Sequence, residues 1–480
     1  MDLPSRVREI LEQLHVSKDK LEVIRDKMVG EFQRGLDVGR PVASIAMLPT
    51  YVPALPDGSE AGKYLALDLS GKNLRIMLLE LHGRGVTPVV HTRNFVVCND
   101  LMVATGSQLF DFIVCCVTKF LSEYQLLNER LSLGFVFSYP CEMKSIRNAN
   151  LLWWTKGFNV QDCLNRDVGD LLQDALDRHG VRELSICMCV PLSLSLSCVA
   201  SLAFVLLKVT VKAVMNDTVG QLAASSYING ADCVIAVVIG YGCNASYLEE
   251  VANIKKFDAS EANYHFPNMV IDTEWEEFGR DGELDFIRTP FDIEVDHNSV
   301  HKGKQIIDKL TGAYFLGELV RVIIDQLAVE GLMFGGDRPE LFTLPDTFPT
   351  KYIAEILSGD GEDESKTKSI RRILEELRIP IHAPMDYIII RDICSAVASR
   401  SASIVAAAIA ALMKRIRRPK LIIGVGGALN SFLPNYHDML KAQLNDLVPP
   451  DVSEWDVLTS EYGSCQGAAL IAATAEKMHL

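Results

Sequence analysis

The chain has 480 residues, which is enough for two or three domains or for one large domain with two lobes. Its 47 Lys and Arg residues against 62 Asp and Glu residues give a net charge of −15, which argues against a nucleic-acid binder held by a generally basic surface. Hydrophobic residues make up 49% and charged residues 23%, so the chain is neither disordered nor collagen-like.

The N-terminal segment is expected to form amphipathic helices that pack on a larger body. Apolar residues recur at helical spacing between positions 5 and 35, as in Val7, Ile10 and Leu14. Charged residues at positions 2, 6, 8 and 9 interrupt any apolar stretch, so this segment does not resemble a signal peptide.

Apolar strands alternate with amphipathic helices after residue 60. The pattern predicts strands at 65–69, 75–81, 86–95 and 131–137, and a helix at 109–126. Such a mixture is typical of an α/β fold in which helices cover sheets. A similar unit begins at 234–239, so we expect two related lobes around a cleft.

A long uncharged run lies between Glu183 and Lys208. Its length exceeds the roughly 18 residues that can indicate a membrane span. A span here would separate the predicted helix 168–179 from the predicted strand 209–215 and would tear one lobe apart. We therefore interpret residues 186–207 as surplus sequence, such as translated intron sequence, with a genuine insertion or a transmembrane helix as alternatives.

The predicted strand 209–215 leads directly into Asn216 and Asp217. In α/β folds the ends of strands are where ligands meet the protein. An Asp in this place could accept a proton from a substrate hydroxyl while the neighbouring amide orients that hydroxyl. Further acids, amides, hydroxyls and an ammonium group in similar places could satisfy the hydroxyls of a sugar: Ser138, Thr155, Lys156, Asn244 and Glu274.

Three predicted strands run into glycine-containing turns, at 70–71, 240–242 and 426–427. A single such turn indicates no function, but three favour phosphate binding, because small residues let backbone N–H groups approach a phosphate closely. None of the turns matches the P-loop pattern G-x-x-x-x-G-K-[ST], so a Walker-type site is excluded.

With these segments the chain resembles the eukaryotic hexokinases from about residue 7 to residue 476. The segments most specific to the resemblance are 137–140, 154–158, 216–220, 271–275, 314–319 and 467–470. The resemblance implies a two-lobed actin-like ATPase (ribonuclease H-like) α/β fold whose lobes close over a sugar. It further implies transfer of the γ-phosphoryl of ATP, which is carried with Mg²⁺, to the 6-hydroxyl of that sugar.

The same resemblance implies a division of the chain and roles for individual residues. Residues 1–60 would pack on the large lobe, 61–215 would form the small lobe, 216–458 the large lobe, and 459–480 a helix returning to the small lobe. Asp217 would be the general base, and Lys156 would help to neutralise charge near the reacting groups. The sugar would be held by Ser138, Thr155, Lys156, Asn216, Asp217, Asn244, Glu274 and Asp308, the last in place of a family Glu.

The nucleotide side departs further from the family pattern. ATP would meet Asp68, Ser70, Gly71, Lys72, Asn73, Arg75, Gly240, Tyr241, Gly242, Gly427, Ala428 and Ser464. The family's Gly-Thr-Gly turn reads Gly-Tyr-Gly at 240–242, and Asp-Leu-Gly-Gly-Thr-Asn reads Asp-Leu-Ser-Gly-Lys-Asn at 68–73. Asp-Gly-Thr or Asp-Gly-Ser reads Gly-Gly-Ala at 426–428, and Glu-Asp-Gly-Ser reads Glu-Tyr-Gly-Ser at 461–464. No resident metal site is expected.

Two functions follow from this pattern. We favour an active hexokinase of the entry step of glycolysis, because the base and most sugar ligands persist. The alternative is a catalytically impaired hexokinase-like protein that binds sugar as a sensor or regulator. We expect a hexose partner (glucose, with fructose and mannose as further candidates), no nucleic acid or membrane partner, and a monomer or weak oligomer. Because the 12 cysteines are scattered, we also expect free thiols and a cytoplasmic location.

Overall fold

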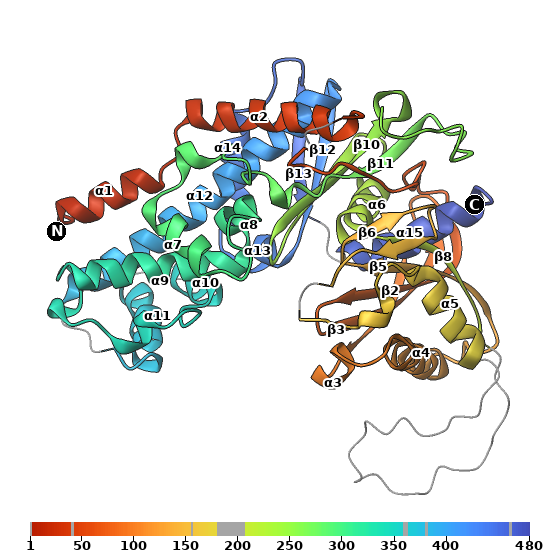
Figure 1. The fold of residues 1–480 in the computed structure, drawn as a ribbon, viewed down its shortest axis with the longest axis horizontal. Helices are drawn as coiled ribbons and strands as arrows, with labels where there is room; N and C mark the ends of the chain where they lie inside the picture. The colour runs from red at the N-terminus through yellow and green to blue at the C-terminus, as the bar shows by residue number, and fades with distance from the viewer. Residues whose placement is uncertain are drawn as a thin grey trace, which may run out of the picture.

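The computed structural model describes residues 2–39, 43–154, 157–179, 207–358, 363–379, 383–459 and 463–480. The uncharged run interpreted as surplus sequence therefore lies outside the described residues, except for its last member, Leu207. Two main sheets form the framework, and most of the helices gather around one of them (Figure 1).

The first sheet has five strands in the order β4-β3-β2-β5-β8. Strands β2, β3 and β4 are antiparallel neighbours, whereas β5 and β8 extend the sheet in parallel. Their bounds are β2 Ala61–Ser70, β3 Asn73–His82, β4 Val89–Val96, β5 Arg130–Phe137 and β8 Lys208–Met215. Helices α4 (Gly106–Glu123) and α5 (Val168–His179) share an apolar core with this sheet, and the short α3 (Asn99–Met102) adjoins α4.

The second sheet repeats this arrangement. Its strands run in the order β1-β11-β10-β9-β12-β13, with β9, β10 and β11 antiparallel and β12 and β13 added in parallel. Their bounds are β1 Leu48–Pro49, β9 Cys233–Ile239, β10 Cys243–Glu250, β11 Asn268–Asp272, β12 Lys420–Gly426 and β13 Glu454–Thr459. Apart from the edge strand β1, the order matches that of the first sheet, which confirms two related halves.

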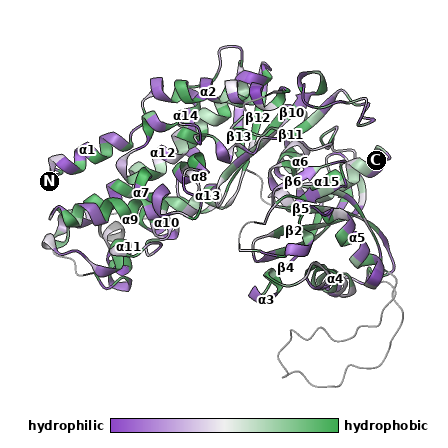
Figure 2. Ribbon diagram, in the orientation of Figure 1, coloured by the Kyte–Doolittle hydropathy of each residue, from purple (hydrophilic) through white to green (hydrophobic). Residues whose placement is uncertain are grey.

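Helices cover the second sheet and form the larger of the two bodies (Figure 1). The outer helices alternate hydrophilic and hydrophobic residues along their length, as Figure 2 shows for α1 and α2. These helices are α1 Ser5–Leu14, α2 Lys18–Leu36, α7 Pro290–Asn298, α8 Ile306–Thr311, α9 Ala313–Val329, α10 Thr350–Leu357, α11 Asp363–Glu376, α12 Pro384–Ile416, α13 Ala428–Phe432 and α14 Tyr436–Asn445.

Helix α12 is long and apolar enough to cross a membrane by length and composition, but 89% of its most apolar window is buried inside the protein. Contacts with α2, α9, α10 and α14 surround it, as expected for the central helix of a folded core. Seven cysteines of the described ranges are free thiols, as the sequence predicts: Cys98, Cys141, Cys163, Cys233, Cys243, Cys394 and Cys465.

Helices α6 (Asp217–Asn229) and α15 (Gly463–Lys477) cross each other and pack on strands of the two sheets. The crossing is close because glycines meet there: a Cβ on Gly467 would collide with the backbone oxygen of Gly220. Each glycine lies about one turn from the start of its helix. The crossing therefore brings the N-terminal ends of α6 and α15 near each other.

Candidate active site

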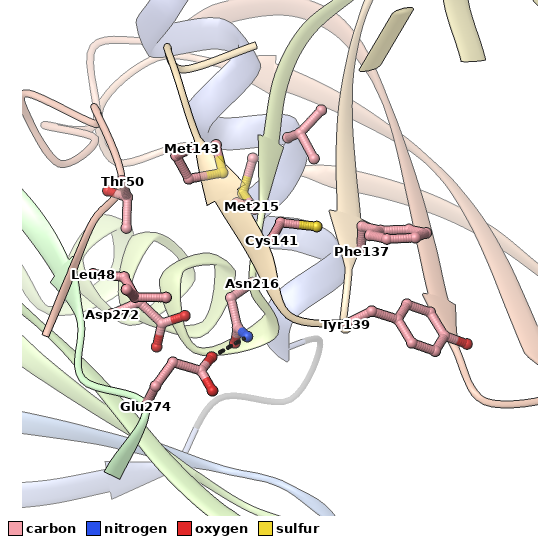
Figure 3. Close-up of a pocket in the computed structure, with 11 residues that line it drawn as sticks. Leu48, Thr50, Phe137, Tyr139, Cys141, Met143, Met215, Asn216, Asp272 and Glu274 are labelled. Carbon is pink, nitrogen blue, oxygen red and sulfur yellow. Dashed lines mark hydrogen bonds between the residues drawn. The ribbon is translucent and has the colours of Figure 1, made fainter. Parts of the chain in front are cut away.

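A pocket opens where strands of both sheets end (Figure 3). Strands β5 and β8 deliver residues from one sheet, and β11 delivers residues from the other. Two short strands, β6 (Cys141–Met143) and β7 (Ala149–Leu151), form a hairpin beside it. The pocket is lined by Leu48, Thr50, Phe137, Tyr139, Cys141, Met143, Val214, Met215, Asn216, Asp272 and Glu274.

Asn216 connects the two sheets through hydrogen bonds. It is the N-cap of α6, and its Oδ1 accepts from the backbone N–H of Thr218 at 3.0 Å. Its Nδ2 then donates to Oε1 of Glu274 at 3.0 Å (Figure 3). Asp217 follows as the first residue of α6, where the helix dipole favours a negative charge.

Asn244 on β10 completes the contact with Glu274. Its Nδ2 donates to Oδ1 of Asp272 at 2.9 Å and to Oε1 of Glu274 at 3.3 Å. Its Oδ1 accepts from the hydroxyl of Thr273 at 3.0 Å and from the N–H of Ala245 at 2.7 Å. Both ends of this amide are therefore held in one orientation, as a site that recognises hydroxyl groups requires.

The backbone at Glu274 is strained, with φ of 46° in the left-handed region. The neighbouring Trp275 holds it there, because its buried ring donates from Nε1 to the carbonyl oxygen of Cys243 at 2.6 Å. This conformation lets the Glu274 carboxyl face Asn216 (Figure 3). Strain of this kind is common where a side chain must be aimed at a ligand.

Asp308, at the start of α8, lies behind the turn between β9 and β10. Its Oδ1 accepts from the backbone N–H of Cys243 at 2.8 Å, and a Cβ on Gly242 would collide with its carboxyl group. Burial, followed by the nearby charge of Glu276, raises the pKa of Asp308 to about 8. Asp308 does not line the pocket of Figure 3, so its predicted contact with the sugar stays a prediction.

The remaining predicted sugar ligands differ in what the structure describes. Ser138 is buried at the end of β5, and its hydroxyl has no hydrogen-bond partner within the described ranges. Thr155 and Lys156 lie outside the described residues, so their predicted roles stay predictions. The aromatic residues on either side of them, Trp154 and Phe158, stack with their ring centres 5.3 Å apart.

The first predicted phosphate turn is the tight hairpin between β2 and β3, with Ser70 opposite Asn73. Gly71 has φ of 56°, which glycine adopts without strain, and Lys72 follows it. Asp68 is buried at the end of β2, where its Oδ2 accepts from the hydroxyl of Ser464 at 3.0 Å. This bond ties the hairpin to the start of α15.

Arg75 points along the surface of β3 and donates from Nε to Oδ1 of Asn94 at 3.2 Å. The second predicted phosphate turn, Gly240 to Gly242, joins β9 and β10 and occupies the same place in its half as the β2–β3 hairpin does in the other. Tyr241 at its tip is 56% exposed, and its ring stacks on Tyr314 with centres 4.3 Å apart.

The third predicted phosphate turn lies where β12 ends and α13 begins. Gly427 has φ of 97°, and a Cβ there would collide with the carbonyl oxygen of Ile239. Ala428 is the first residue of α13. Since β9 and β12 are parallel neighbours, the second and third turns lie at the same edge of the sheet. The structure thus brings these two predicted turns together.

Comparisons with known proteins agree with this geometry. Residues 6–227 match the first hexokinase family model and residues 234–474 match the second. The chain belongs to the hexokinase family. It is 36% identical to a Brugia malayi hexokinase over 99% of this chain and 78% of the relative, and 33% identical to a Schistosoma mansoni hexokinase over 99% and 98%. Mammalian relatives such as mouse hexokinase HKDC1 are about twice as long, since the chain spans 48% of them.

A solved structure gives the same assignment for the fold. The Schistosoma mansoni hexokinase complexed with glucose matches with a TM-score of 0.83 and 33% identity, covering 98% of each chain. The hexokinase chain described here therefore has the two-lobed actin-like sugar kinase fold that the sequence predicts.

Three further residues of the site were not predicted from the sequence: Asp272, Thr218 and Ser246. The hydroxyl of Thr218 lies 2.6 Å from that of Ser246, 3.1 Å from Oδ1 of Asn216 and 3.3 Å from Oδ1 of Asp272. A signal for Ser246 was present, because residues two apart on a strand point to the same face, and Ser246 follows Asn244 by two on β10. Asp272 ends β11 and Thr218 lies on α6, so neither carries this signal.

Proposed function

We propose that this hexokinase family member transfers the γ-phosphoryl of Mg-ATP to the 6-hydroxyl of glucose or a related hexose, with Asp217 as the general base. The observation that carries the proposal is the hydrogen-bonded set of Asn216, Asn244 and Glu274 beside Asp217 at the start of α6. The glucose bound in the structure of the Schistosoma mansoni relative supports glucose as the substrate.

The polar groups of the pocket suit a sugar. The Glu274 carboxylate can accept hydrogen bonds from hydroxyl groups, and the amides of Asn216 and Asn244 fix where that carboxylate lies. The buried Ser138 hydroxyl, which has no partner among the described residues, would gain one from a bound hexose. A site of fixed donors and acceptors discriminates against molecules that leave them unpaired.

Asp217 would accept the proton of the 6-hydroxyl as that oxygen attacks the phosphorus atom. Its place at the first position of α6 puts this carboxyl group at the positive end of the helix dipole, within reach of a hydroxyl that enters the pocket beside Asn216. We expect the Asp217 carboxylate to contribute less than positioning, because phosphoryl transfer depends mainly on aligned reactants and neutralised charge.

The three glycine-containing turns would hold the nucleotide. Gly71 and Gly427 have positive φ, and the close contact of Gly427 with Ile239 leaves no room for a side chain. Turns of this kind can direct backbone N–H groups at a phosphate. Mg-ATP supplies the phosphoryl group, and its metal ion neutralises phosphate charge. The turns at 70–73, 240–242 and 426–428 would bind and orient it.

The altered side chains of the nucleotide side motivated the alternative of a sugar sensor, which the comparisons do not favour. Backbone N–H groups bind phosphate irrespective of the side chain they carry, so Tyr241 and Ala428 are compatible with catalysis. We further propose a cytoplasmic protein that is a monomer or weak oligomer. The seven free thiols named above support a reducing compartment.

The test is a coupled assay of glucose-dependent ADP formation with Mg-ATP. We expect turnover by the wild-type chain and a kcat about 100- to 10,000-fold lower for Asp217→Asn, with glucose binding retained by calorimetry. Glucose binding without any turnover by the wild-type chain would favour the sensor. Equal turnover by Asp217→Asn would exclude the proposed base.

A further inference from the structure

Asp272 is a buried carboxyl group that the proposed reaction does not use. It is the last residue of β11, its side chain lines the pocket, and only 5% of the residue is exposed. Figure 3 shows Asp272 beside Glu274, with both carboxyl groups directed towards Asn216. The two carboxyl groups share a donor, because Nδ2 of Asn244 donates to Oδ1 of Asp272 at 2.9 Å and to Oε1 of Glu274 at 3.3 Å.

Hydrogen bonds connect Asp272 to Asn244 on β10 and to Thr218 on α6. Its Oδ1 accepts from Nδ2 of Asn244 at 2.9 Å and from the hydroxyl of Thr218 at 3.3 Å. Thr218 lies in the first turn of α6, one residue after Asp217. Asn244 and Asn216 both donate to Oε1 of Glu274, so the contacts form a closed ring. A change in the charge of Asp272 would therefore reach every member of this ring.

The surroundings of the pair are strongly acidic. Besides burial, the charges of Glu276 and Asp217 raise the pKa of Asp272, and the charge of Glu276 also raises the pKa of Glu274. In the same way, the charge of Glu277 adds to the effect of burial on Glu276, and the charge of Glu276 adds to that on Asp308. Within the described ranges, no Lys or Arg forms an ion pair with Asp272, Glu274 or Glu276. The groups that face Asp272 from β1 and β10 are uncharged, namely Leu48 and Ser246.

A buried carboxyl group and a half-buried one that share the donor Asn244 cannot both ionise at low cost, so one proton is retained between them. Burial raises the pKa of Asp272 to about 7, and burial together with the adjacent Asp272 charge raises the pKa of Glu274 well above its usual range. At neutral pH the shared proton joins the two groups. Loss of that proton would leave two carboxylates that repel each other.

We propose that Asp272 is a positioning residue for sugar binding, which shares one proton with Glu274 and thereby holds the amides of Asn216 and Asn244 in the orientation that a hexose requires. This inference rests on the proposed function, because it concerns the same sugar site. Glu274 then accepts hydrogen bonds from the hydroxyl groups of the sugar, while Asp272 keeps the Glu274 carboxyl group in place. Ionisation of both carboxyl groups separates them and displaces the amides that each one binds.

Sugar affinity therefore depends on pH on the alkaline side. Once the pair loses its last proton, the dissociation constant for glucose rises by up to about tenfold per pH unit, because binding must restore one proton. The KM for ATP does not share this dependence, since the nucleotide turns are not members of the ring.

The experiment measures the glucose dissociation constant of the full chain by calorimetry from pH 6 to pH 9. The variants are Asp272→Asn, whose amide can still accept from Asn244 and donates permanently to Glu274, and the exposed Asp451→Asn as a matched control. Wild type and control should lose about tenfold or more in affinity between pH 7 and pH 9. Asp272→Asn should bind with nearly the same affinity throughout.

Each other outcome is equally informative. Wild-type binding that is independent of pH, or an Asp272→Asn variant that loses affinity equally at every pH, would overturn the proton-sharing role and leave the proposed function intact. Absence of glucose binding by the wild type at any pH would instead overturn the proposed function.

A second measurement covers the case in which Asp272→Asn does not fold, as judged by its thermal transition. Wild-type calorimetry in two buffers of different ionisation enthalpy should show proton uptake on glucose binding that increases from pH 7 to pH 9. No uptake at pH 9 contradicts the proposal.

Discussion

The sugar side and the nucleotide side of this site are built in different ways. On the sugar side, side chains on β10 and at the ends of β8 and β11 bind one another in a closed ring, so each amide and carboxyl group has a fixed direction. On the nucleotide side, the binding groups we propose are backbone N–H groups of two hairpin turns and of the turn after β12. The side chain at the tip of one of these turns, Tyr241, is exposed. A ring of side chains tolerates little substitution, whereas backbone turns tolerate more. This difference accounts for intact sugar ligands beside an altered nucleotide side.

The largest effect specific to one side is expected at Glu274. Glu274→Gln keeps the shape but replaces a carboxyl group that accepts from two amides by an amide that also donates, so we expect the KM for glucose to rise about 10- to 100-fold. The KM for ATP should change little. Steady-state kinetics with each substrate varied separately check this, with the exposed Glu261→Gln as control. Equal changes in both KM values would show that the two sides are not separate.

The crossing of α6 and α15 is shared by both sides, because α6 begins with Asp217 and α15 begins beside Ser464, which binds Asp68. Gly467→Ala would place a methyl group against the backbone of Gly220, and we expect the free energy of unfolding to fall by about 1–3 kcal/mol. Denaturant unfolding measures it.

The matched control for this variant is Gly30→Ala in α2, where nothing lies within 4 Å of the added methyl group. That variant should gain up to about 1 kcal/mol, since alanine favours a helix more than glycine does. A neutral Gly467→Ala would mean that the helices can separate without cost.

The buried acids of the sugar side predict how stability depends on pH. Folding raises the pKa of Asp272 to about 7 and that of Asp308 to about 8, so between pH 4 and pH 8 the native state binds more protons than the unfolded state. Stability therefore falls as the pH rises through this window, by up to about 1.4 kcal/mol per pH unit for each group. Thermal melting of wild type and Asp308→Asn at several pH values checks this dependence. The melting temperature of the variant should fall less steeply with rising pH than that of the wild type. An equal dependence on pH would contradict the raised pKa of Asp308.

The sequence predicted the framework of the site better than its contacts. Strand ends gather at one edge of a sheet by construction, so the places of Asn216 and Ser138 followed from local pattern. The bond from Asn216 to Glu274 joins residues 58 positions apart in different sheets, and no local pattern contains it. Asp308 shows the same limit. The family resemblance implied a sugar contact for it, but its hydrogen bond to Cys243 depends on where α8 packs.

The smallest expected effect is at Tyr241, and it tests whether the nucleotide side depends on backbone alone. Tyr241→Thr restores a small hydroxyl that could donate to a phosphate and removes a ring that stacks on Tyr314. One added hydrogen bond should lower the KM for ATP about two- to tenfold and leave the KM for glucose unchanged. Tyr241→Phe, which keeps the ring, is the control and should resemble the wild type. A higher KM for ATP in Tyr241→Thr would instead mean that the aromatic pair itself contacts the nucleotide. In that case the exposed stack, and not the turn beneath it, would have replaced the family's hydroxyl as a binding element.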